Sequence, residues 1–339
     1  MKTTQNPTMS ALQLTAYKQP LMLNTTPMPE IDDDQVLVEV YASAINPLDF
    51  KIAQGELRLI LPYPLPQTMG NDVAGKIVKI GKNVQKFQIG DEIYACPRNQ
   101  HMGTFADFVA LHQDDIAPKP AVLNFTDAAG VPLVALTAYQ ALFEVLKVQA
   151  GQKVLILAGS GGVGTIAIQM AKLAGCHVAT TASASSADWL KSLGADAVID
   201  YKTQDFTKIL RDFDAVLDTQ GGDDLKNAFK ILKSGGKVVS VAGMPTAKFA
   251  KNRGLGLVKQ ALFGLLSYPI YRQARRYHAD YEFLFMKADG KQLQTIGEWI
   301  QQGKLHPITD QVFDFKDVFD ALAYASTGRA KGKVVLKMK

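Results

Sequence analysis

A glycine-rich turn between an apolar strand pattern and a helical pattern constrains the fold of this chain more than any other feature. The apolar run covers residues 154–159 (VLILAG), and the helical pattern covers residues 163–174. Glycines stand there at the spacing G-x-G-x-x-G, at Gly159, Gly161 and Gly164, with Gly162 as a fourth. A motif placed after a strand and at the start of a helix predicts a turn that holds the pyrophosphate of a dinucleotide.

Each glycine of the motif has a physical reason to be there. The first permits a tight turn, the second lets the backbone approach the pyrophosphate, and the third lets helix and strand pack closely. Free N–H groups of the first helical turn then face the phosphates. The alternative is an incidental glycine-rich turn in an α/β protein that binds no nucleotide.

Strand and helix patterns divide the chain of 339 residues into two domains. After about residue 125 apolar strands alternate with helices, which predicts a parallel sheet covered on both faces. The expected strands are residues 154–159, 177–182, 197–201, 213–219, 237–243 and 281–286, and the expected helices include 163–174, 186–193 and 223–233. Earlier strand patterns at 36–44, 73–80 and 105–111 are split by Gly, Pro, Asn and Asp, which is typical of an irregular all-β domain. We therefore expect domains at 1–125 and 126–303, with the strand-rich tail 304–339 completing the first.

Cysteine content and hydropathy narrow the class of protein. Only Cys96 and Cys176 occur, which excludes a disulfide framework and a multi-cysteine zinc lobe. No apolar run reaches the roughly 18 to 20 residues needed to span a bilayer, and the first residues have no signal-peptide core. We therefore expect a cytoplasmic protein.

Positive charge is concentrated in one segment of the chain. The formal net charge is +5, yet residues 245–279 carry seven Lys and Arg residues and no acid, so the remainder is slightly acidic. A local excess argues against a general nucleic-acid-binding protein. Within this basic insertion (245–280), residues 262–278 join an apolar and aromatic run to three arginines. Two interpretations stay open: an amphipathic element that makes peripheral membrane contact, and a helix that packs on the domain as a lid or dimer contact.

The end of the second strand indicates which dinucleotide binds. In an NAD site an acid about 20 residues after the glycine loop bonds the ribose 2′-hydroxyl. Here the first acid is Asp188, already in the next helix, and three small hydroxyls precede it at Ser183, Ser185 and Ser186. A carboxylate would repel a 2′-phosphate, whereas hydroxyls can hold it, so NADP(H) is favoured. The alternative for one of these serines is a plain helix N-cap.

Motifs along nearly the whole chain resemble one known family. They are SAINPLDFKIAQG (43–55), MGNDVAGKIVKIGKNVQKFQIGDEIYA (69–95), GTFADFVAL (103–111), AGSGGVGTIAIQMAK (158–172), SLGADAVIDY (192–201) and GRAKGKVVL (328–336). In this order they resemble the zinc-independent branch of the medium-chain dehydrogenases/reductases, the quinone oxidoreductase group, close to plant-type enone and alkenal reductases. The resemblance implies an α/β fold in which a Rossmann-type doubly wound parallel sheet accompanies a GroES-like irregular β domain.

The positions that bind zinc in the zinc-dependent relatives differ in this chain. Those relatives have an early cysteine and a Gly-His-Glu, whereas this chain has Asn46 and the sequence GND at 70–72. Catalytic zinc needs at least three N, S or O ligands from the protein. His101 and His112 could each supply one, but lone loop histidines are more often surface residues, so no metal is expected.

The resemblance also implies roles for individual residues. Lys51 reaches the cofactor or substrate at the cleft between the domains and Asn46 helps line it, which makes these two the candidate catalytic residues. The candidate cofactor-binding residues are Lys51, Gly159, Gly161, Gly162, Val163, Gly164, Ser183, Ser185, Ser186, Tyr201, Thr219, Gly243, Arg329 and Lys333. The alternatives are ordinary strand packing for Tyr201 and simple solvation for Lys51, Arg329 and Lys333.

The function that these features predict is an NADPH-dependent reduction of a quinone or of the C=C bond of an α,β-unsaturated carbonyl, without zinc. Lys51 would stabilise the charge that develops on the carbonyl oxygen or would hold the nicotinamide ribose. The resemblance suggests a homodimer through the edge strand of the nucleotide-binding sheet, with 237–243 and 281–286 as candidates. Two alternatives remain: an enoyl reductase that acts on a carrier-tethered chain, and a nucleotide-loaded RNA- or membrane-binding protein with little turnover.

Overall fold

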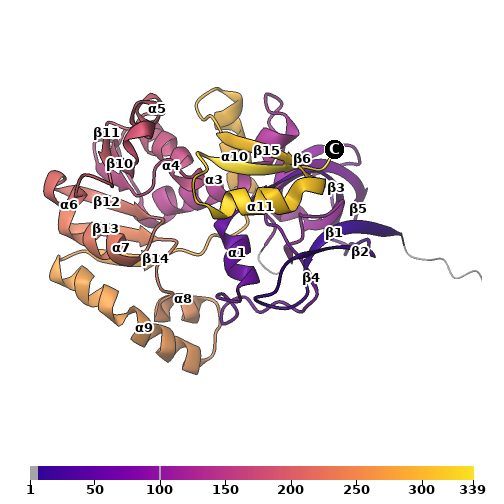
Figure 1. Cartoon of the computed structure of the whole chain (residues 1–339), viewed down its shortest axis with the longest axis horizontal. Helices are drawn as coiled ribbons and strands as arrows, with labels where there is room; N and C mark the ends of the chain where they lie inside the picture. Colours follow the sequence, from indigo (N-terminus) through magenta and orange to yellow (C-terminus); the bar gives the residue numbers. More distant parts are fainter. Residues whose placement is uncertain (1–6, 99–100) are drawn as a thin grey trace, which may run out of the picture. The chain divides into compact units, whose positions relative to one another are not determined.

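The computed structural model describes residues 7–98 and 101–339, which form two compact units (Figure 1). Unit 1 contains the described residues up to Leu136 together with Lys287–Gly303 and Pro307–Lys339. Unit 2 contains Thr137–Met286 and Lys304–His306. The boundary after residue 125 expected from the sequence therefore lies eleven residues later, and residues 287–303 belong to the first unit rather than the second.

Unit 1 is built on a seven-stranded sheet, which confirms the expected β domain. Its order is β15 (Thr309–Asp314), β16 (Lys333–Lys337), β3 (Gln35–Ile45), β5 (Val73–Ile80), β6 (Glu92–Ala95) and β8 (Ile116–Pro118), with β7 (Phe108–His112) also paired to β3. The core comes from alternate residues of β3, Val36, Val38 and Val40, packed with Ile77 and Ile93. A second sheet has the order β2 (Met22–Pro27), β1 (Thr8–Leu14) and β4 (Gln67–Thr68).

One pairing in unit 1 joins two strands that are far apart in the sequence. Strand β16 runs antiparallel to β3, with Val334 opposite Ile45. Because α1 (Pro47–Ala53) begins directly after β3, this register puts Lys333 beside the start of that helix. The other helices of this unit are α2 (Phe125–Ala129), α10 (Gly290–Gln301), α11 (Val318–Ser326) and the single 3₁₀ turns Gln113–Asp115 and Phe315–Asp317.

Helix α10 explains the unexpected boundary. It buries Leu293, Ile296 and Ile300 along one face, and its first residue packs so closely that a Cβ on Gly290 would lie 2.3 Å from the carbonyl oxygen of Ile116. The buried hydroxyl of Tyr94 donates to the carbonyl oxygen of Leu293 at 2.5 Å. Contacts so distant in sequence cannot be read from local patterns, so the sequence assigned this helix to the wrong domain.

Unit 2 contains a six-stranded sheet in which all neighbouring strands are parallel. The order is β11 (Ala197–Asp200), β10 (His177–Ala182), β9 (Lys153–Ile156), β12 (Phe213–Asp218), β13 (Leu232–Ser240) and β14 (Asp280–Phe283). Counted along the chain this order is 3-2-1-4-5-6, the arrangement of a doubly wound Rossmann sheet. The predicted fold class is confirmed.

Helices alternate with these strands. They are α4 (Gly162–Leu173), α5 (Ala187–Ser192), α6 (Phe206–Ile209), α7 (Gly222–Ala228), α8 (Ala247–Asn252) and α9 (Leu257–Arg276). Helix α3 (Pro132–Tyr139) contains the boundary between the units after Leu136 and continues into a π-helical segment, Gln140–Leu146. In unit 2, 3₁₀ turns cover Ala184–Ser186 and Phe229–Ile231. Strand β13 lies between β12 and β14, so residues 237–243 are not the edge that the sequence suggested for dimer pairing, and of the two candidate strands only β14 is an edge.

Candidate functional site

The glycine turn of unit 2 has the close packing that its spacing predicts. A Cβ on Gly159 would lie 2.1 Å from the Oγ1 atom of Thr180 in the neighbouring strand, and one on Gly164 would lie 2.4 Å from the carbonyl oxygen of Ala158. Gly161 differs, because its Cβ would meet nothing closer than 3.5 Å. The first and third glycines are therefore required by the fold, whereas the second leaves space for a ligand to approach the backbone.

The start of α4 is left without a side-chain cap. Gly161 is its N-cap residue and has no side chain to accept the first N–H groups, while Gly162 and Val163 form the partly exposed first turn. The N–H groups and the positive end of the helix dipole suit an anionic ligand. These residues fit the pyrophosphate of a dinucleotide.

The three serines after β10 lie together. The Ser183 hydroxyl is 3.1 Å from that of Ser185 and 3.4 Å from that of Ser186. None of these side chains caps the short helices that Ser183 and Ser186 precede, so the N-cap alternative is not their role. Three adjoining hydroxyls with no acid among them fit a ribose 2′-phosphate.

The remaining expected residues of unit 2 follow the ends of parallel strands, and so they lie at one edge of the sheet. Tyr201 comes directly after β11 and is 62% exposed, so it is not ordinary strand packing. Thr219 follows β12 and its hydroxyl donates to the carbonyl oxygen of Leu157 at 3.0 Å. The N–H of Gly243, beyond β13, donates to Ser240 Oγ at 2.7 Å. This edge at the carboxyl ends of the strands is where doubly wound sheets bind ligands.

A buried aspartate that the sequence did not single out fixes two of these turns. Asp218 accepts the N–H groups of Gln220 and Gly221, both at 2.9 Å, and the Ser240 hydroxyl at 2.5 Å. Burial raises the pKa of this carboxyl above its ordinary value, and these hydrogen bonds oppose the shift. The only sequence signal was an acid at the end of an apolar strand.

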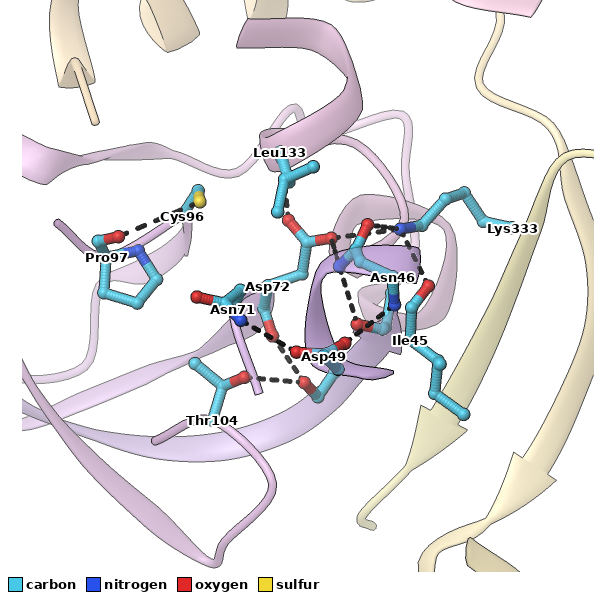
Figure 2. A network of polar contacts seen from close by, with 12 residues as sticks. Ile45, Asn46, Asp49, Asn71, Asp72, Cys96, Pro97, Thr104, Leu133 and Lys333 are labelled. Atoms are coloured by element: carbon cyan, nitrogen blue, oxygen red, sulfur yellow. Dashed lines mark hydrogen bonds and ion pairs between the residues drawn. The ribbon is translucent and has the colours of Figure 1, made fainter. Parts of the chain in front are cut away.

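Unit 1 holds a buried polar network around Asn46 and Lys333 (Figure 2). The Lys333 ammonium forms an ion pair with Asp72 at 3.2 Å and donates to the carbonyl oxygen of Ile45 at 3.1 Å and to Asn46 Oδ1. All three of its protons are therefore engaged inside the unit. Lys333 is therefore not exposed to solvent, which was one interpretation of the sequence. Its ammonium also has no N–H group left to donate to a cofactor, which the other interpretation required.

Two buried carboxyls share this network. Asp72 accepts the Asn46 side-chain amide at 2.9 Å and the N–H of Leu133 at 2.7 Å. Asp49 accepts the N–H of Asn46 at 2.8 Å and the side-chain amide of Asn71 at 2.7 Å. Burial raises the pKa of Asp49 to about 7 and also raises that of Asp72, against the effect of the nearby ammonium. The sequence missed Asp49 entirely and noted Asn71 and Asp72 only as departures from a zinc motif.

The donor set of this network does not fit a zinc ion. Its amides and carboxylates are hydrogen-bonded to one another and to the Lys333 ammonium. Zinc, in contrast, prefers sulfur and imidazole nitrogen as ligands. Burial raises the pKa of the Cys96 thiol well above its ordinary value, which disfavours the thiolate that binds metals. His112 accepts the N–H of Asp114 as a local helix cap. Among residues 7–98 and 101–339, no three His, Cys, Asp or Glu side chains are grouped as a metal site.

Asn46 and Lys51 both belong to helix α1, but of the two only Lys51 has, within the described residues, a side chain that is free to contact a ligand. Asn46 is buried at the N-cap, where its amide also donates to the carbonyl oxygen of Ala44 at 3.1 Å, so it holds the helix start in place rather than presenting a group to a substrate. Lys51 lies half-buried in the last turn, and no side-chain partner for its ammonium is found in the described part of the chain. Arg329 is exposed on the turn before β16, apart from the network.

Comparisons with known proteins place both halves of the chain in one group. Residues 32–121 match the alcohol dehydrogenase GroES-like domain, and residues 193–336 match a family described as zinc-binding dehydrogenase. The chain is 35% identical to a 2-methylene-furan-3-one reductase of Solanum lycopersicum and to a chloroplastic NADPH-dependent alkenal/one oxidoreductase of Arabidopsis thaliana, each over 91% of this chain and 73% of the relative. It is also similar to the quinone oxidoreductase structure of Coxiella burnetii, with a TM-score of 0.84, 31% identity, and coverage of 98% and 100% of the two chains.

Two glycine variants separate folding from ligand binding. Gly159→Ala places a methyl group against the buried Thr180, so we expect the free energy of unfolding to fall by about 2 to 3 kcal/mol. Gly161→Ala has room for its methyl group, so stability should hold while the dissociation constant for NADPH rises at least about tenfold. Urea unfolding and fluorescence titration measure the two quantities. Equal effects of both variants on stability would contradict these assignments.

Lys333→Met should be strongly destabilising, because it leaves two buried carboxyls without their cation. We expect a loss of about 3 to 5 kcal/mol in the free energy of unfolding at neutral pH, measured by urea denaturation. The matched control is Lys331→Met at an exposed position two residues away, which should change stability by less than about 0.5 kcal/mol. If the variant does not fold at neutral pH, mild acid should restore folding by protonating the carboxyls. Equal stability of the two variants would remove Lys333 from the network.

Asp49 should make stability depend on pH. Because its pKa is raised to about 7, the folded chain keeps a proton that the unfolded chain releases above about pH 4. This contribution to stability is fully present below about pH 4 and is lost as the pH rises through 7; that of Asp72 has the same sign. The unfolding free energy of the wild type minus that of Asp49→Asn should therefore fall by about 2 to 3 kcal/mol between about pH 5 and pH 8. A flat or rising difference in urea titrations would rule this out.

Proposed function

This chain is a member of the medium-chain dehydrogenase/reductase family, and from that premise we propose that it reduces a quinone or the C=C bond of an α,β-unsaturated carbonyl with NADPH. Relatives named as enone, alkenal/one and quinone oxidoreductases support the reaction class. The oxidoreductase assignment follows from the family itself.

The observation that carries the proposal is the ligand-binding edge of the unit 2 sheet. The open second glycine and the uncapped first turn of α4 suit a pyrophosphate, and the serine hydroxyls suit a 2′-phosphate. Bound NADPH would supply the hydride. A carboxylate that would repel the phosphate is absent from the turn Ser183–Ser186, and this favours NADPH over NADH.

Lys51 is the group of unit 1 that we assign to the chemistry. Negative charge develops on the carbonyl oxygen when hydride adds to the β-carbon of an enone, and a nearby cation or donor stabilises that charge. The Lys51 ammonium is half-buried and unengaged by any described side chain, whereas that of Lys333 is fully used. Lys51 can act on this oxygen or on a hydroxyl of the nicotinamide ribose.

We also propose that catalysis does not require zinc. What supports this is the donor set: Asn46, Asn71 and Asp72 stand at the positions where the zinc-dependent relatives have their ligands, and they are hydrogen-bonded to one another through Asp49 and to the Lys333 ammonium. A divalent cation beside that ammonium would meet repulsion. The expected homodimer and cytoplasmic location stay predictions.

A coenzyme-oxidation screen tests the proposal. The full chain is incubated with NADPH or NADH and with short enones, alkenals and quinones, and the loss of reduced coenzyme is followed by absorbance. We expect turnover with at least one class, preference for NADPH, and no loss of rate after treatment with a chelator. Tight NADPH binding without turnover on any class would favour a nucleotide-loaded binding protein, and turnover only on a carrier-bound chain would favour the enoyl reductase alternative.

Lys51→Ala should lower kcat/KM for the best enone by about ten- to a hundredfold, because a donor to the developing oxyanion is lost. Lys51→Arg should recover part of the rate, since it keeps the positive charge. Lys331→Ala, which removes an exposed lysine near β16, serves as the control and should leave the rate unchanged. Steady-state rates of all three variants decide this, and unchanged kinetics of Lys51→Ala would remove Lys51 from the site.

A further inference from the structure

Helix α9 has one face buried in unit 2. Phe263, Ser267 and Ala274 are buried at spacings of four and seven residues, and the helix lies beside α8 and β14 (Figure 1). This face meets the requirement that a helix packed on a domain bury an apolar stripe. The opposite face should then be polar.

The opposite face is instead largely apolar. Val258, Leu262, Leu265 and Pro269 follow one another at helical spacing on the side away from the core. Val258 is 84% exposed and Leu265 is 73% exposed, and Leu257, Leu266 and Tyr268 add to the same apolar surface. We call these seven residues the α9 outer face. Large apolar patches of this kind usually mark a contact site.

Cations near the α9 outer face come from a segment of the chain that has no acid. Residues 245–279 contain no acid, and the exposed side chains of Lys251, Arg272, Arg275 and Arg276 adjoin α8 and the end of α9. Lys248 is neutralised by Glu282 at 2.8 Å, so it is not part of this excess. The result is an apolar helical surface bordered at one end by cations for which no ion pair is found among residues 7–98 and 101–339.

We propose that the α9 outer face docks the protein on an anionic lipid bilayer, with the helix lying in the plane of the interface. Apolar side chains would enter the headgroup region, and the arginines would meet lipid phosphates, as in interfacial amphipathic helices. None of the helices in the described part of the chain is long and apolar enough to cross a bilayer, so the contact is peripheral.

Charge complementarity selects this occupant over a second copy of the chain. In a two-fold contact each copy would bring the same acid-free segment 245–279, so α9 of one copy would offer no carboxylate to the cations of the other. An anionic bilayer attracts the same cations while its interior accepts the leucines.

A hollow next to the helix extends the apolar surface. It has a volume of about 650 Å³ and is lined by Leu225, Gly243, Met244, Leu266 and Tyr268, with Arg272 also in its wall. Met244 is itself half-exposed there. Because Gly243 also belongs to the ligand-binding edge of the sheet, this hollow adjoins that edge as well as α9.

Vesicle flotation with the full chain tests the proposal. We expect binding to vesicles of mixed phosphatidylglycerol and phosphatidylcholine at low salt, release as salt rises, and little binding to pure phosphatidylcholine. The double variant Val258→Glu and Leu265→Glu should lower the partition coefficient at least tenfold, as should Arg275→Glu with Arg276→Glu. The matched control is Ile209→Glu, an equally apolar residue of α6 that is 49% exposed, and it should bind like the wild type.

All these variants alter exposed side chains, so their melting temperatures and their oxidation of NADPH with a water-soluble enone should equal those of the wild type. This readout keeps membrane docking separate from the proposed reaction. Failure of the wild type to bind anionic vesicles at low salt would overturn the proposal. It would also be overturned if Ile209→Glu lost vesicle binding as fully as the α9 variants. A concentration-dependent dimer through α9 in sedimentation, without vesicle binding, would overturn it as well.

Discussion

The ion pair between Lys333 and Asp72 is the interaction on which unit 1 depends most. A buried ammonium and a buried carboxylate are each costly to remove from water, and only a close partner and further hydrogen bonds offset that cost. Lys333 finds both because β16 pairs with β3, so the C-terminal strand and the first helix are fixed together. The position of α1, and with it that of Lys51, follows from one buried charge pair.

Unit 2 depends on strand register in a comparable way. Parallel pairing aligns the ends of five strands, so glycine, serine and threonine residues from distant parts of the sequence reach one edge. Asp218 then fixes the turns after β12 and β13 by accepting hydrogen bonds from three donor groups. The close contacts at Gly159 and Gly164 hold the backbone of the glycine-rich turn in one position. The unit thus presents a preformed surface for a dinucleotide, which lowers the entropy lost on binding.

Local patterns predicted most of unit 2, because a doubly wound sheet repeats short apolar strands and amphipathic helices whose signals are self-contained. They named Lys333 but could not predict its buried role, because its partner atom on Ile45 is 288 residues away. They assigned α10 to the wrong unit for the same reason. Asn46 was noticed as a departure from a metal motif, but its role follows only from the network that buries it. The serine turn was predicted because the absence of an acid is itself a local signal.

The cation in the Asn46 network is encoded in the chain rather than recruited from solution. A zinc enzyme needs a supply of metal, can be emptied by a chelator and can be loaded with the wrong ion. Here the positive charge is the ammonium of Lys333, which is a covalent part of the chain and so cannot exchange with another ion. Under the proposed zinc-independent reaction, activity would not depend on metal supply, and hydrogen bonding and charge would activate the substrate.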